Sequence, residues 1–296
     1  MRGGYYLEGI IVKAVGGFYD VRADDNKIYR CKARGRFRKD SSNLFVGDRV
    51  RFTPMGDDEG VVEKIMPRKN RLIRPPIVNV DMVIIFFSLK DPILNFSLLD
   101  RILVLAESNY LEALICLNKV DLVEDEDIPA CRIYRSAGYQ VILTSALTGQ
   151  GVEEVKGSLK DKISVFTGPS GSGKSTFLNR IQTRLKLKVG DISAKTRRGK
   201  QTTRQVELLP FDFGGLVADS PGFSQLDLKD IGSDELPFLF PEISRLSAGC
   251  KFSGCSHEHE PSCAVKEALN RGEISQSRYK NYLTLLNELR EKERSY

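Results

Sequence analysis

The strongest indication of fold in this 296-residue chain is one glycine-rich segment, Gly168-Pro169-Ser170-Gly171-Ser172-Gly173-Lys174-Ser175-Thr176. An apolar segment, Ile163 to Phe166, precedes it and is predicted to be a strand, and a helix is expected from Thr176 onward. Glycines let backbone N–H groups surround phosphate oxygens, and the N-terminus of a helix favours an anion. Lys174 is placed to reach the β- and γ-phosphates and to act in catalysis, and the Ser175 hydroxyl is placed to ligate Mg²⁺. An ordinary glycine-rich turn lacks this combination, so the segment predicts a P-loop.

Further apolar segments predict the rest of a parallel sheet. Met82 to Phe87 is continuously apolar, as a strand buried on both faces requires. Leu98 to Ala106 fits a crossover helix, with Asn95 or Ser97 as its cap. Three more core strands are expected, at Ala113 to Leu117, Val141 to Leu143 and Leu216 to Ala218. Strands that alternate with helices indicate an α/β domain, which we place at residues 71-226.

The last of these strands leads into Asp219-Ser220-Pro221-Gly222. An aspartate at the end of such a strand is placed to hold the water shell of Mg²⁺, and the Gly222 N–H can reach the γ-phosphate. Alone this is a common turn sequence, but after a P-loop it predicts the second half of a phosphate site.

Two loops before the P-loop indicate which base is bound. Asn118-Lys119-Val120-Asp121 follows one predicted strand, and Thr144-Ser145-Ala146 follows the next. The Asp121 carboxylate can accept two hydrogen bonds, from N1–H and the exocyclic amine of guanine, and adenine offers no such pair of donors. A surface turn is the alternative for the first loop alone. Together with the second loop and the P-loop, it predicts a guanine site.

The first seventy residues predict a different domain. Short segments rich in β-branched and aromatic residues, separated by turn residues, recur at 7–13, 17–23, 28–34, 48–53 and 59–66. Five short strands indicate a small barrel at residues 1-70, with an OB-fold as the leading interpretation and an SH3-like barrel as the alternative.

Basic residues gather in three groups, in a chain with a formal net charge of +6. Their members are Arg30, Lys32, Arg34, Arg36, Arg38 and Lys39; Arg68, Lys69, Arg71 and Arg74; and Lys195, Arg197, Arg198, Lys200 and Arg204. The groups fit either a solvated surface or binding to nucleic acid or a large ribonucleoprotein.

The C-terminal region, residues 227-296, contains a C-x₄-C-x-H-x₅-C pattern formed by Cys250, Cys255, His257 and Cys263. Three thiolates and one imidazole suit a tetrahedral Zn²⁺ with no position left for catalysis, so one zinc per chain is expected. His259 is the alternative imidazole, and simple packing of the cysteines is the alternative to a metal site. A closing helix is predicted from the spacing of Tyr279, Tyr282, Leu283, Leu286 and Leu289.

Composition is that of an ordinary globular protein, with 41% hydrophobic and 28% charged residues. No apolar run approaches the ~20 residues of a membrane span, and the N-terminus lacks a signal peptide's apolar stretch. We therefore expect a cytoplasmic protein with no membrane partner.

The base loops precede the P-loop in this chain, whereas ordinary GTPases have the P-loop first. With the barrel before them and the cysteine cluster after them, these motifs make the chain resemble the ribosome small-subunit-dependent GTPases of the RsgA (YjeQ) family, which are circularly permuted. The resemblance covers essentially the full length. It implies GTP and GDP as ligands and binding to the small ribosomal subunit and its rRNA during late maturation. It also implies hydrolysis stimulated by the subunit, and zinc on the four positions named above. A monomer is expected.

The residues of the hydrolysis step depart from two patterns. Phe223 stands where Ras-like GTPases place a water-orienting glutamine, so slow intrinsic turnover is expected. The family usually has histidine before its threonine pair, and here Gln201 precedes Thr202 and Thr203. Gln201 is either a water-positioning residue or a solvated loop residue, and Thr202 or Thr203 is expected to ligate Mg²⁺.

Two other functions remain open at this point. A P-loop ATPase or kinase would prefer ATP, which the Asp121 loop argues against. A non-catalytic RNA-binding scaffold is favoured by the basic barrel, but it does not require Lys174, Ser175 and Asp219.

Overall fold

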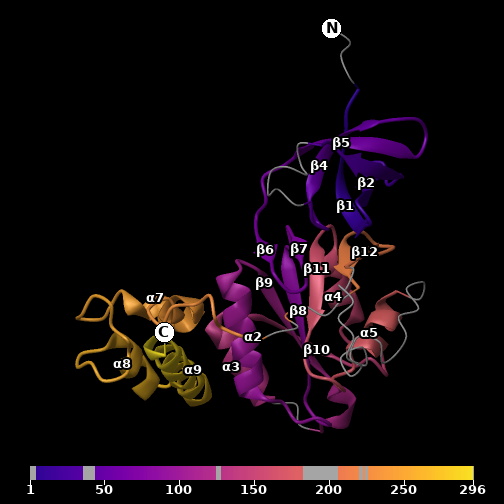
Figure 1. The fold of residues 1–296 in the computed structure, drawn as a ribbon. Helices are drawn as coiled ribbons and strands as arrows, with labels where there is room; N and C mark the ends of the chain where they lie inside the picture. The colour runs from indigo at the N-terminus through magenta and orange to yellow at the C-terminus, as the bar shows by residue number, and fades with distance from the viewer. Residues whose placement is uncertain are drawn as a thin grey trace. The chain divides into compact units, whose positions relative to one another are not determined.

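The computed structural model describes residues 5–35, 44–124, 128–182, 206–219, 223 and 226–295 (Figure 1). The chain divides into two compact units. The first comprises Met1–Met82, Lys156–Phe166 and Ile181–Ser224, and the second comprises Val83–Val155, Thr167–Arg180 and Gln225–Tyr296.

The N-terminal part of the first unit is a closed barrel of five strands. They are β1 (Leu7–Val15), β2 (Phe18–Ala23), β3 (Ile28–Ala33), β4 (Arg49–Pro54) and β5 (Glu59–Ile65). The order around the barrel is β1-β2-β3-β5-β4, with β3 and β5 parallel, so the path is the Greek key of an OB-fold rather than a simple meander. Alternate side chains of the strands fill the barrel, including Ile11, Val21 and Phe52. The predicted five-stranded barrel is confirmed.

A sheet of six strands has the order β10-β9-β8-β11-β13-β12. The strands are β8 (Met82–Ser88), β9 (Glu112–Asn118), β10 (Gln140–Thr144), β11 (Ile163–Thr167), β12 (Leu208–Pro210) and β13 (Leu216–Ala218). β9 and β10 are parallel, as are β11 and β13, whereas β12 is an antiparallel edge strand. Every residue of β8 is buried, which explains its continuous apolar run. A separate hairpin joins β6 (Arg71–Leu72) and β7 (Ile77–Val78).

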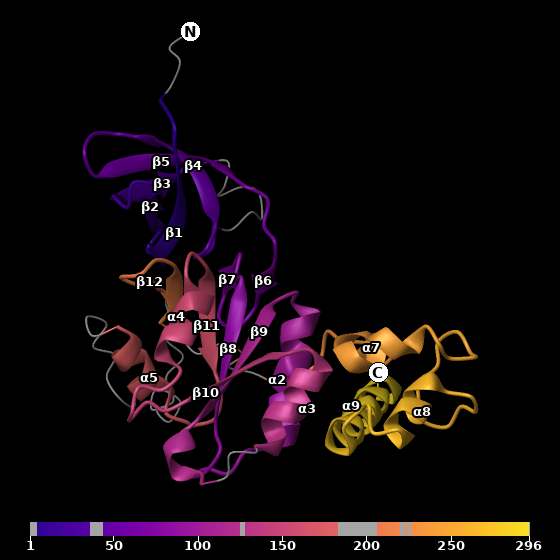
Figure 2. The same ribbon diagram turned by 180° about the vertical axis from the view of Figure 1, so that it is seen from behind.

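Helices of the second unit include α2 (Phe96–Ser108) and α3 (Pro129–Ala137), which lie side by side in Figure 1 and in the reverse view of Figure 2. The predicted cap of α2 is confirmed at Asn95, whose side chain accepts a hydrogen bond of 3.0 Å from the Leu98 N–H. Three more elements lie near the nucleotide loops: the short 3₁₀ turn η1 (Val120–Leu122) and the helices α4 (Val152–Leu159) and α5 (Lys174–Ile181).

The C-terminal region of the second unit is helical, with η2 (Leu236–Leu239), α7 (Pro241–Ser247), α8 (Ala264–Asn270) and α9 (Gln276–Arg294). The predicted closing helix is α9. Its Arg278 is 1% exposed and joins this region to α2, because it donates to Asp100 on α2 and to Glu242 on α7. Among the described residues, no helix has the length and apolarity that crossing a membrane demands.

Candidate nucleotide site and metal centre

The P-loop runs from the end of β11 to the start of α5, and two of its glycines are required by close neighbours. A Cβ on Gly168 would lie 2.0 Å from the Phe86 carbonyl oxygen. A Cβ on Gly173 would lie 2.2 Å from the Asn118 side-chain nitrogen. Both glycines also have positive φ, of 133° and 90°, which side-chain-bearing residues rarely adopt. The loop can therefore adopt this path only with glycine at these positions.

Lys174 is buried and points into the loop. Its Nζ donates to the carbonyl oxygens of Gly168 at 2.8 Å and Pro169 at 2.7 Å, and to Ser172 Oγ at 3.3 Å. Burial lowers the pKa of Lys174 to about 8, because desolvation disfavours the charged ammonium. A phosphate group at the loop would place a negative charge beside it. The residues therefore fit a phosphate ligand.

The two base loops meet the P-loop at Asn118, the last residue of β9. Its amide donates to the Ser172 carbonyl oxygen at 2.8 Å, and its Oδ1 accepts from Thr144 Oγ1 and from the Ala146 N–H, both at 3.2 Å. Asn118 is 1% exposed, so these bonds form away from water. One side chain thus ties the P-loop to the second base loop.

Asp121 lies in the exposed turn η1, where its carboxylate accepts a hydrogen bond from Ser145 Oγ. Lys119, directly before the turn, donates from Nζ to the Asp91 carbonyl oxygen. The structure therefore brings the predicted residues of both base loops together, with the Asp121 carboxylate oriented by its neighbour and still accessible.

Arg180, at the end of α5, was not foreseen as part of this site. Its guanidinium donates to three consecutive carbonyl oxygens of the second base loop, at 3.3 Å to Ala146, 3.0 Å to Leu147 and 3.1 Å to Thr148. A Cβ on Gly149 would lie only 2.8 Å from Arg180 Nη2, so glycine leaves the space that the guanidinium needs. Arg180 belongs to no recognised motif. The only signal for it in the sequence is its place on the helix that begins at the P-loop.

Asp219 follows β13, the parallel neighbour of β11, so it stands at the carboxyl end of the adjacent strand. Its backbone N–H donates to the Glu207 carbonyl oxygen at 2.9 Å, and its Oδ1 accepts from the Glu207 N–H at 2.9 Å. A carboxylate oxygen such as that of Asp219 is the kind of ligand that Mg²⁺ prefers. Ser175, in the first turn of α5, offers a hydroxyl oxygen, which is also a suitable Mg²⁺ ligand.

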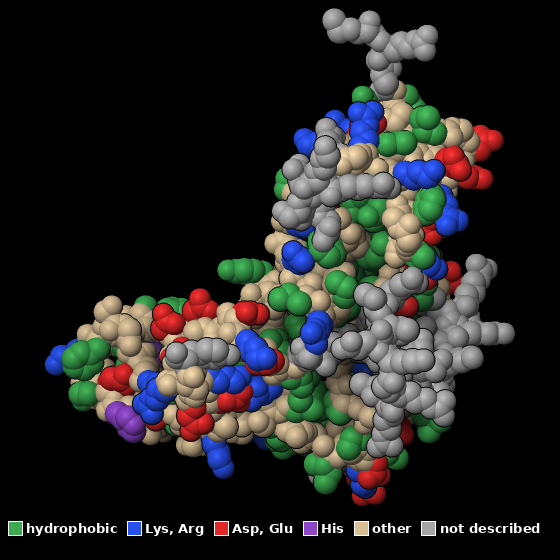
Figure 3. All heavy atoms as spheres, viewed as in Figure 1, with side chains coloured by type: hydrophobic (Ala, Val, Ile, Leu, Met, Phe, Trp, Pro, Cys, Tyr) green, Lys and Arg blue, Asp and Glu red, His purple; other side chains and the backbone are tan. Residues whose placement is uncertain are grey.

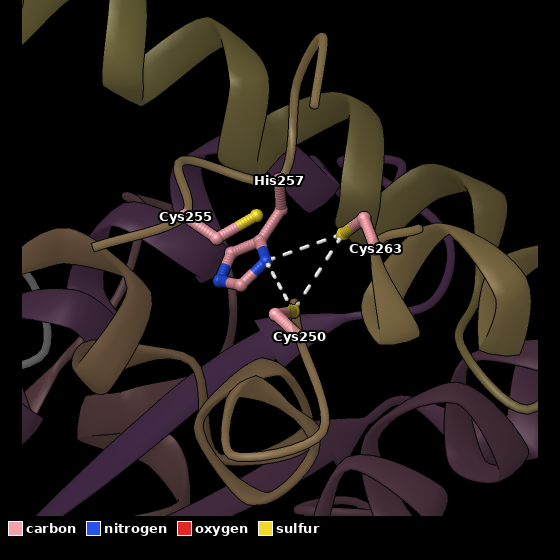
Figure 4. Close-up of side chains that lie close together, drawn as sticks. All are labelled: Cys250, Cys255, His257 and Cys263. Atoms are coloured by element: carbon pink, nitrogen blue, oxygen red, sulfur yellow. Dashed lines mark hydrogen bonds between the residues drawn. The ribbon is translucent and has the colours of Figure 1, made fainter. Parts of the chain in front are cut away.

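The structure brings together the four side chains predicted to bind a metal, Cys250, Cys255, His257 and Cys263. Their potential ligand atoms all lie within 4.8 Å of one another (Figure 4). His257 Nδ1 is 3.5 Å from the Cys250 sulfur and 3.4 Å from the Cys263 sulfur, and these two sulfurs are 3.9 Å apart. Tetrahedral Zn²⁺ with Zn–S bonds of about 2.3 Å separates two sulfurs by about 3.8 Å. The donor atoms therefore fit zinc. His259 lies outside the cluster, with its side chain 88% exposed.

Hydrogen bonds hold the loop that carries these four residues in shape. On α9, Tyr279 donates to the His257 carbonyl oxygen at 2.6 Å, and Tyr282 donates to that of Ser256 at 2.7 Å. The other imidazole nitrogen of His257, Nε2, is 3.1 Å from Ser247 Oγ, which leaves Nδ1 to face the sulfurs. Burial alone would raise the pKa of Glu260, but hydrogen bonds from Ser256 and from the Glu258 N–H lower it to about 2.

Comparison with known proteins supports the same interpretation. The profile described as RsgA GTPase matches residues 65–229, and that described as RsgA N-terminal domain matches residues 8–62. The chain belongs to the RsgA GTPase family.

Relatives of RsgA type match over nearly their whole length. Proteins named small ribosomal subunit biogenesis GTPase RsgA are 47% identical in Caldanaerobacter subterraneus, with 97% of both chains covered, and 44% identical in Bacillus subtilis, with 98% of this chain and 99% of that one covered. The crystal structure of YjeQ from Thermotoga maritima has a TM-score of 0.84 and 40% identity, and covers 96% of this chain and 99% of that one. The crystal structure of YloQ, a circularly permuted GTPase, has the same TM-score and identity, over 99% and 98% of the two chains.

RsgA family members are GTP hydrolases, and this chain carries their GTPase domain. The predicted family, the permuted motif order and the class of enzyme are therefore confirmed, and a kinase is excluded. Several predicted site residues lie outside the described residues, namely Gln201, Thr202, Thr203 and Gly222. Phe223 is described, and its ring is buried.

Proposed function

We propose that this protein hydrolyses GTP while bound to the small ribosomal subunit and its rRNA, late in the maturation of that subunit. The observation that carries the proposal is the Asn118 side chain, which joins the P-loop to both base loops in one site. The names of the full-length relatives support the choice of partner. We further propose a cytoplasmic monomer.

In the proposed site, Asp121 accepts the two hydrogen bonds of guanine, while Ser145 and Arg180 hold the base loops in place. The remaining base-loop contacts are assigned to Asn118, Lys119, Val120 and Ala146. The guanine edge then distinguishes GTP from ATP, because adenine would leave the Asp121 carboxylate without donors.

At the phosphate end, backbone N–H groups of Gly168 and of Ser170 to Thr176 surround the phosphate oxygens, and Lys174 moves its ammonium from the loop carbonyls onto the β- and γ-phosphates. Mg²⁺, when bound, neutralises charge that develops on the phosphates. We assign its ligands to Ser175, Asp219 and one of Thr202 and Thr203. Gln201 is proposed to orient the attacking water, and the Gly222 N–H to contact the γ-phosphate.

The zinc site is proposed to be structural, with one ion held by Cys250, Cys255, His257 and Cys263. Four protein ligands leave no position for a substrate, and the loop is short enough for the metal to contribute to its folding. We place the domain boundaries at 1-70, 71-226 and 227-296.

The barrel is proposed to contact rRNA. Lys and Arg side chains lie on the face of the barrel drawn in Figure 3. Arg30 and Lys32 on β3 both lie over the Phe18 ring, at 4.7 and 5.3 Å from its centre, so this strand presents cations beside an aromatic ring. Arg68 differs, because it forms two hydrogen bonds with the buried Asp48, at 2.6 and 2.8 Å, and serves the fold.

The experiment that tests the proposal is steady-state hydrolysis of GTP and of ATP, with and without purified small ribosomal subunits. We expect hydrolysis of GTP only, and a faster rate with small subunits than without. Large ribosomal subunits at the same concentration serve as the control for nonspecific RNA. Equal rates with either subunit would contradict the proposed partner, and equal rates with ATP would contradict the guanine site.

A further inference from the structure

The barrel strand β1 contacts the segment that leads into β12, at Lys13 and Glu207. The two residues form an antiparallel β-bridge, and Lys13 Nζ donates to Glu207 Oε2 at 2.7 Å. β1 and β12 lie next to each other in both Figure 1 and Figure 2. These residues are 194 positions apart in sequence and belong to the same compact unit. A barrel residue is thereby joined to the edge of the sheet.

Glu207 also holds Asp219. Its N–H donates to Asp219 Oδ1 at 2.9 Å, and its carbonyl oxygen accepts from the Asp219 N–H at 2.9 Å. The residues on either side, Val206 and Leu208, are buried, so the backbone of Glu207 is fixed between them. One residue thus contacts both the proposed Mg²⁺-side aspartate and the barrel.

Three carboxylates near this junction favour the charged form of Lys13. The pKa of Lys13 is raised, first by its hydrogen bond to Glu207 and then by that carboxylate's charge, with smaller contributions from Asp20 and Asp219. The side chains of Lys13 and Glu207 are 37% and 35% exposed. An ion pair that is about one-third exposed contributes little to overall stability. Its effect is therefore expected in the placement of the Glu207 backbone and of the Asp219 that this backbone holds.

We propose that Lys13 is a positioning residue for Asp219, and that it acts through Glu207 by fixing the backbone that holds the aspartate carboxylate. The inference rests on the proposed role of Asp219 in holding Mg²⁺. It makes the metal side of the nucleotide site depend on a residue of the barrel. No contact of Lys13 with nucleotide is involved.

The test is the release rate of a fluorescent GDP analogue, measured from the full chain as Mg²⁺ is varied. Loss of groups that orient metal ligands typically costs 10–100-fold in metal affinity, and Lys13 acts one step further away. We therefore expect Lys13→Met and Glu207→Gln each to raise the half-saturating Mg²⁺ concentration about threefold to tenfold. The charge-swapped pair, Lys13→Glu with Glu207→Lys, should return it to within about twofold of wild type. Release without Mg²⁺ should be the same in all four proteins.

The matched control is Lys27→Met, which removes another barrel lysine paired with an acid, Asp58 at 3.7 Å. This variant should keep the wild-type Mg²⁺ dependence. If it shifts as much as Lys13→Met, the effect is a general one of barrel charge and the inference is overturned. A swapped pair as defective as either single variant would also overturn it, because charge complementarity would then not matter.

Asp219→Asn separates this inference from the function on which it rests. If Asp219→Asn leaves the Mg²⁺ dependence unchanged, Asp219 does not serve the metal, and the assignment and the inference fail together. If Asp219→Asn shifts the dependence and both Lys13→Met and Glu207→Gln do not, only the inference fails. Glu207→Gln keeps the shape and backbone of the residue, so it remains informative even if Lys13→Met folds poorly.

Discussion

Removing the buried guanidinium of Arg278 should destabilise the second unit more than any other single loss of charge described above. Arg278 donates from Nε and Nη2 to the two oxygens of Glu242, at 2.7 and 2.9 Å, and from Nη1 to Asp100 Oδ1 at 2.7 Å. The guanidinium also lies 4.6 Å from the centre of the Phe240 ring. All three charged side chains are at least 95% inaccessible to solvent.

The expected magnitude follows from the carboxylates that Arg278→Met would leave behind. Glu242 would lose both charge-assisted bonds, whereas Asp100 would keep those from Tyr134 and Asn281. Breaking a buried ion pair by removing one partner costs about 3–5 kcal/mol, and methionine replaces most of the apolar stem, so we expect a loss in that range.

The assay is urea unfolding followed by circular dichroism, with Arg271→Met as the control. Arg271 pairs with Glu273 at 2.6 Å, but both side chains are exposed, so its loss should leave the midpoint unchanged. Glu242→Gln added to Arg278→Met should recover part of the deficit, because one uncompensated charge is removed. If Arg278→Met unfolds at the same urea concentration as Arg271→Met, the reasoning about the buried network is wrong.

The same variant should show a characteristic pH dependence. Burial raises the pKa of Asp100 and the Arg278 charge opposes that rise, so removing Arg278 should move the folded-state pKa higher still. A carboxyl whose folded pKa exceeds its unfolded value costs stability above that pKa, and the cost disappears as the pH falls. The difference in unfolding free energy between wild type and Arg278→Met should therefore shrink as the pH is lowered from 7. A constant difference would show that the carboxylates are not its source.

Four further predictions concern the nucleotide and metal sites. Because burial lowers the pKa of Lys174 to about 8 and a phosphate should raise it, GDP binding should take up about half a proton at pH 8 and about a tenth at pH 7. Titration calorimetry in buffers of different ionisation enthalpy measures this, and no buffer dependence at pH 8 would contradict it. Asp121→Asn should weaken GTP binding by about two orders of magnitude or more and favour xanthosine triphosphate, whose 2-oxo group accepts where guanine donates. Unchanged GTP affinity in equilibrium titrations would remove Asp121 from the base site. Cys250→Ser should lose the bound zinc in native mass spectrometry, whereas His259→Ala, whose side chain is 88% exposed, should retain one equivalent. Full zinc content in the first variant would refute the ligand assignment. Gln201→Ala should lower kcat on saturating small subunits at least about tenfold with little change in GTP affinity, in the range that proton-transfer groups supply. Wild-type single-turnover rates would instead point to groups supplied by the subunit.

The sequence alone was sufficient for the family, the barrel, the order of the motifs and the P-loop. The P-loop is one contiguous segment, whereas the barrel and the family are recognised from several such local motifs and from their order along the chain, so none of them required knowledge of contacts between distant side chains. At Gly168 and Gly173 the pattern states directly which positions cannot accept a side chain. The strand β8 was equally visible, because burial on both faces requires an uninterrupted apolar run. The short helices α3 and α4, and the edge strand β12, were not singled out, although Pro129 and Gly138 mark the two ends of α3 in the sequence.

Side-chain partners from distant segments became visible only in the folded chain. Asn118 was predicted in the base loop, but its hydrogen bond to the Ser172 carbonyl oxygen spans 54 positions. Nothing in the local sequence around either residue indicates that the two are partners. Lys13 and Glu207 are 194 positions apart, and Arg278 and Asp100 are 178 apart. A lysine or arginine in a sequence looks the same whether it is solvated or buried against a carboxylate. Only the chain path that brings the carboxylate within about 3 Å and excludes water determines which of the two it is.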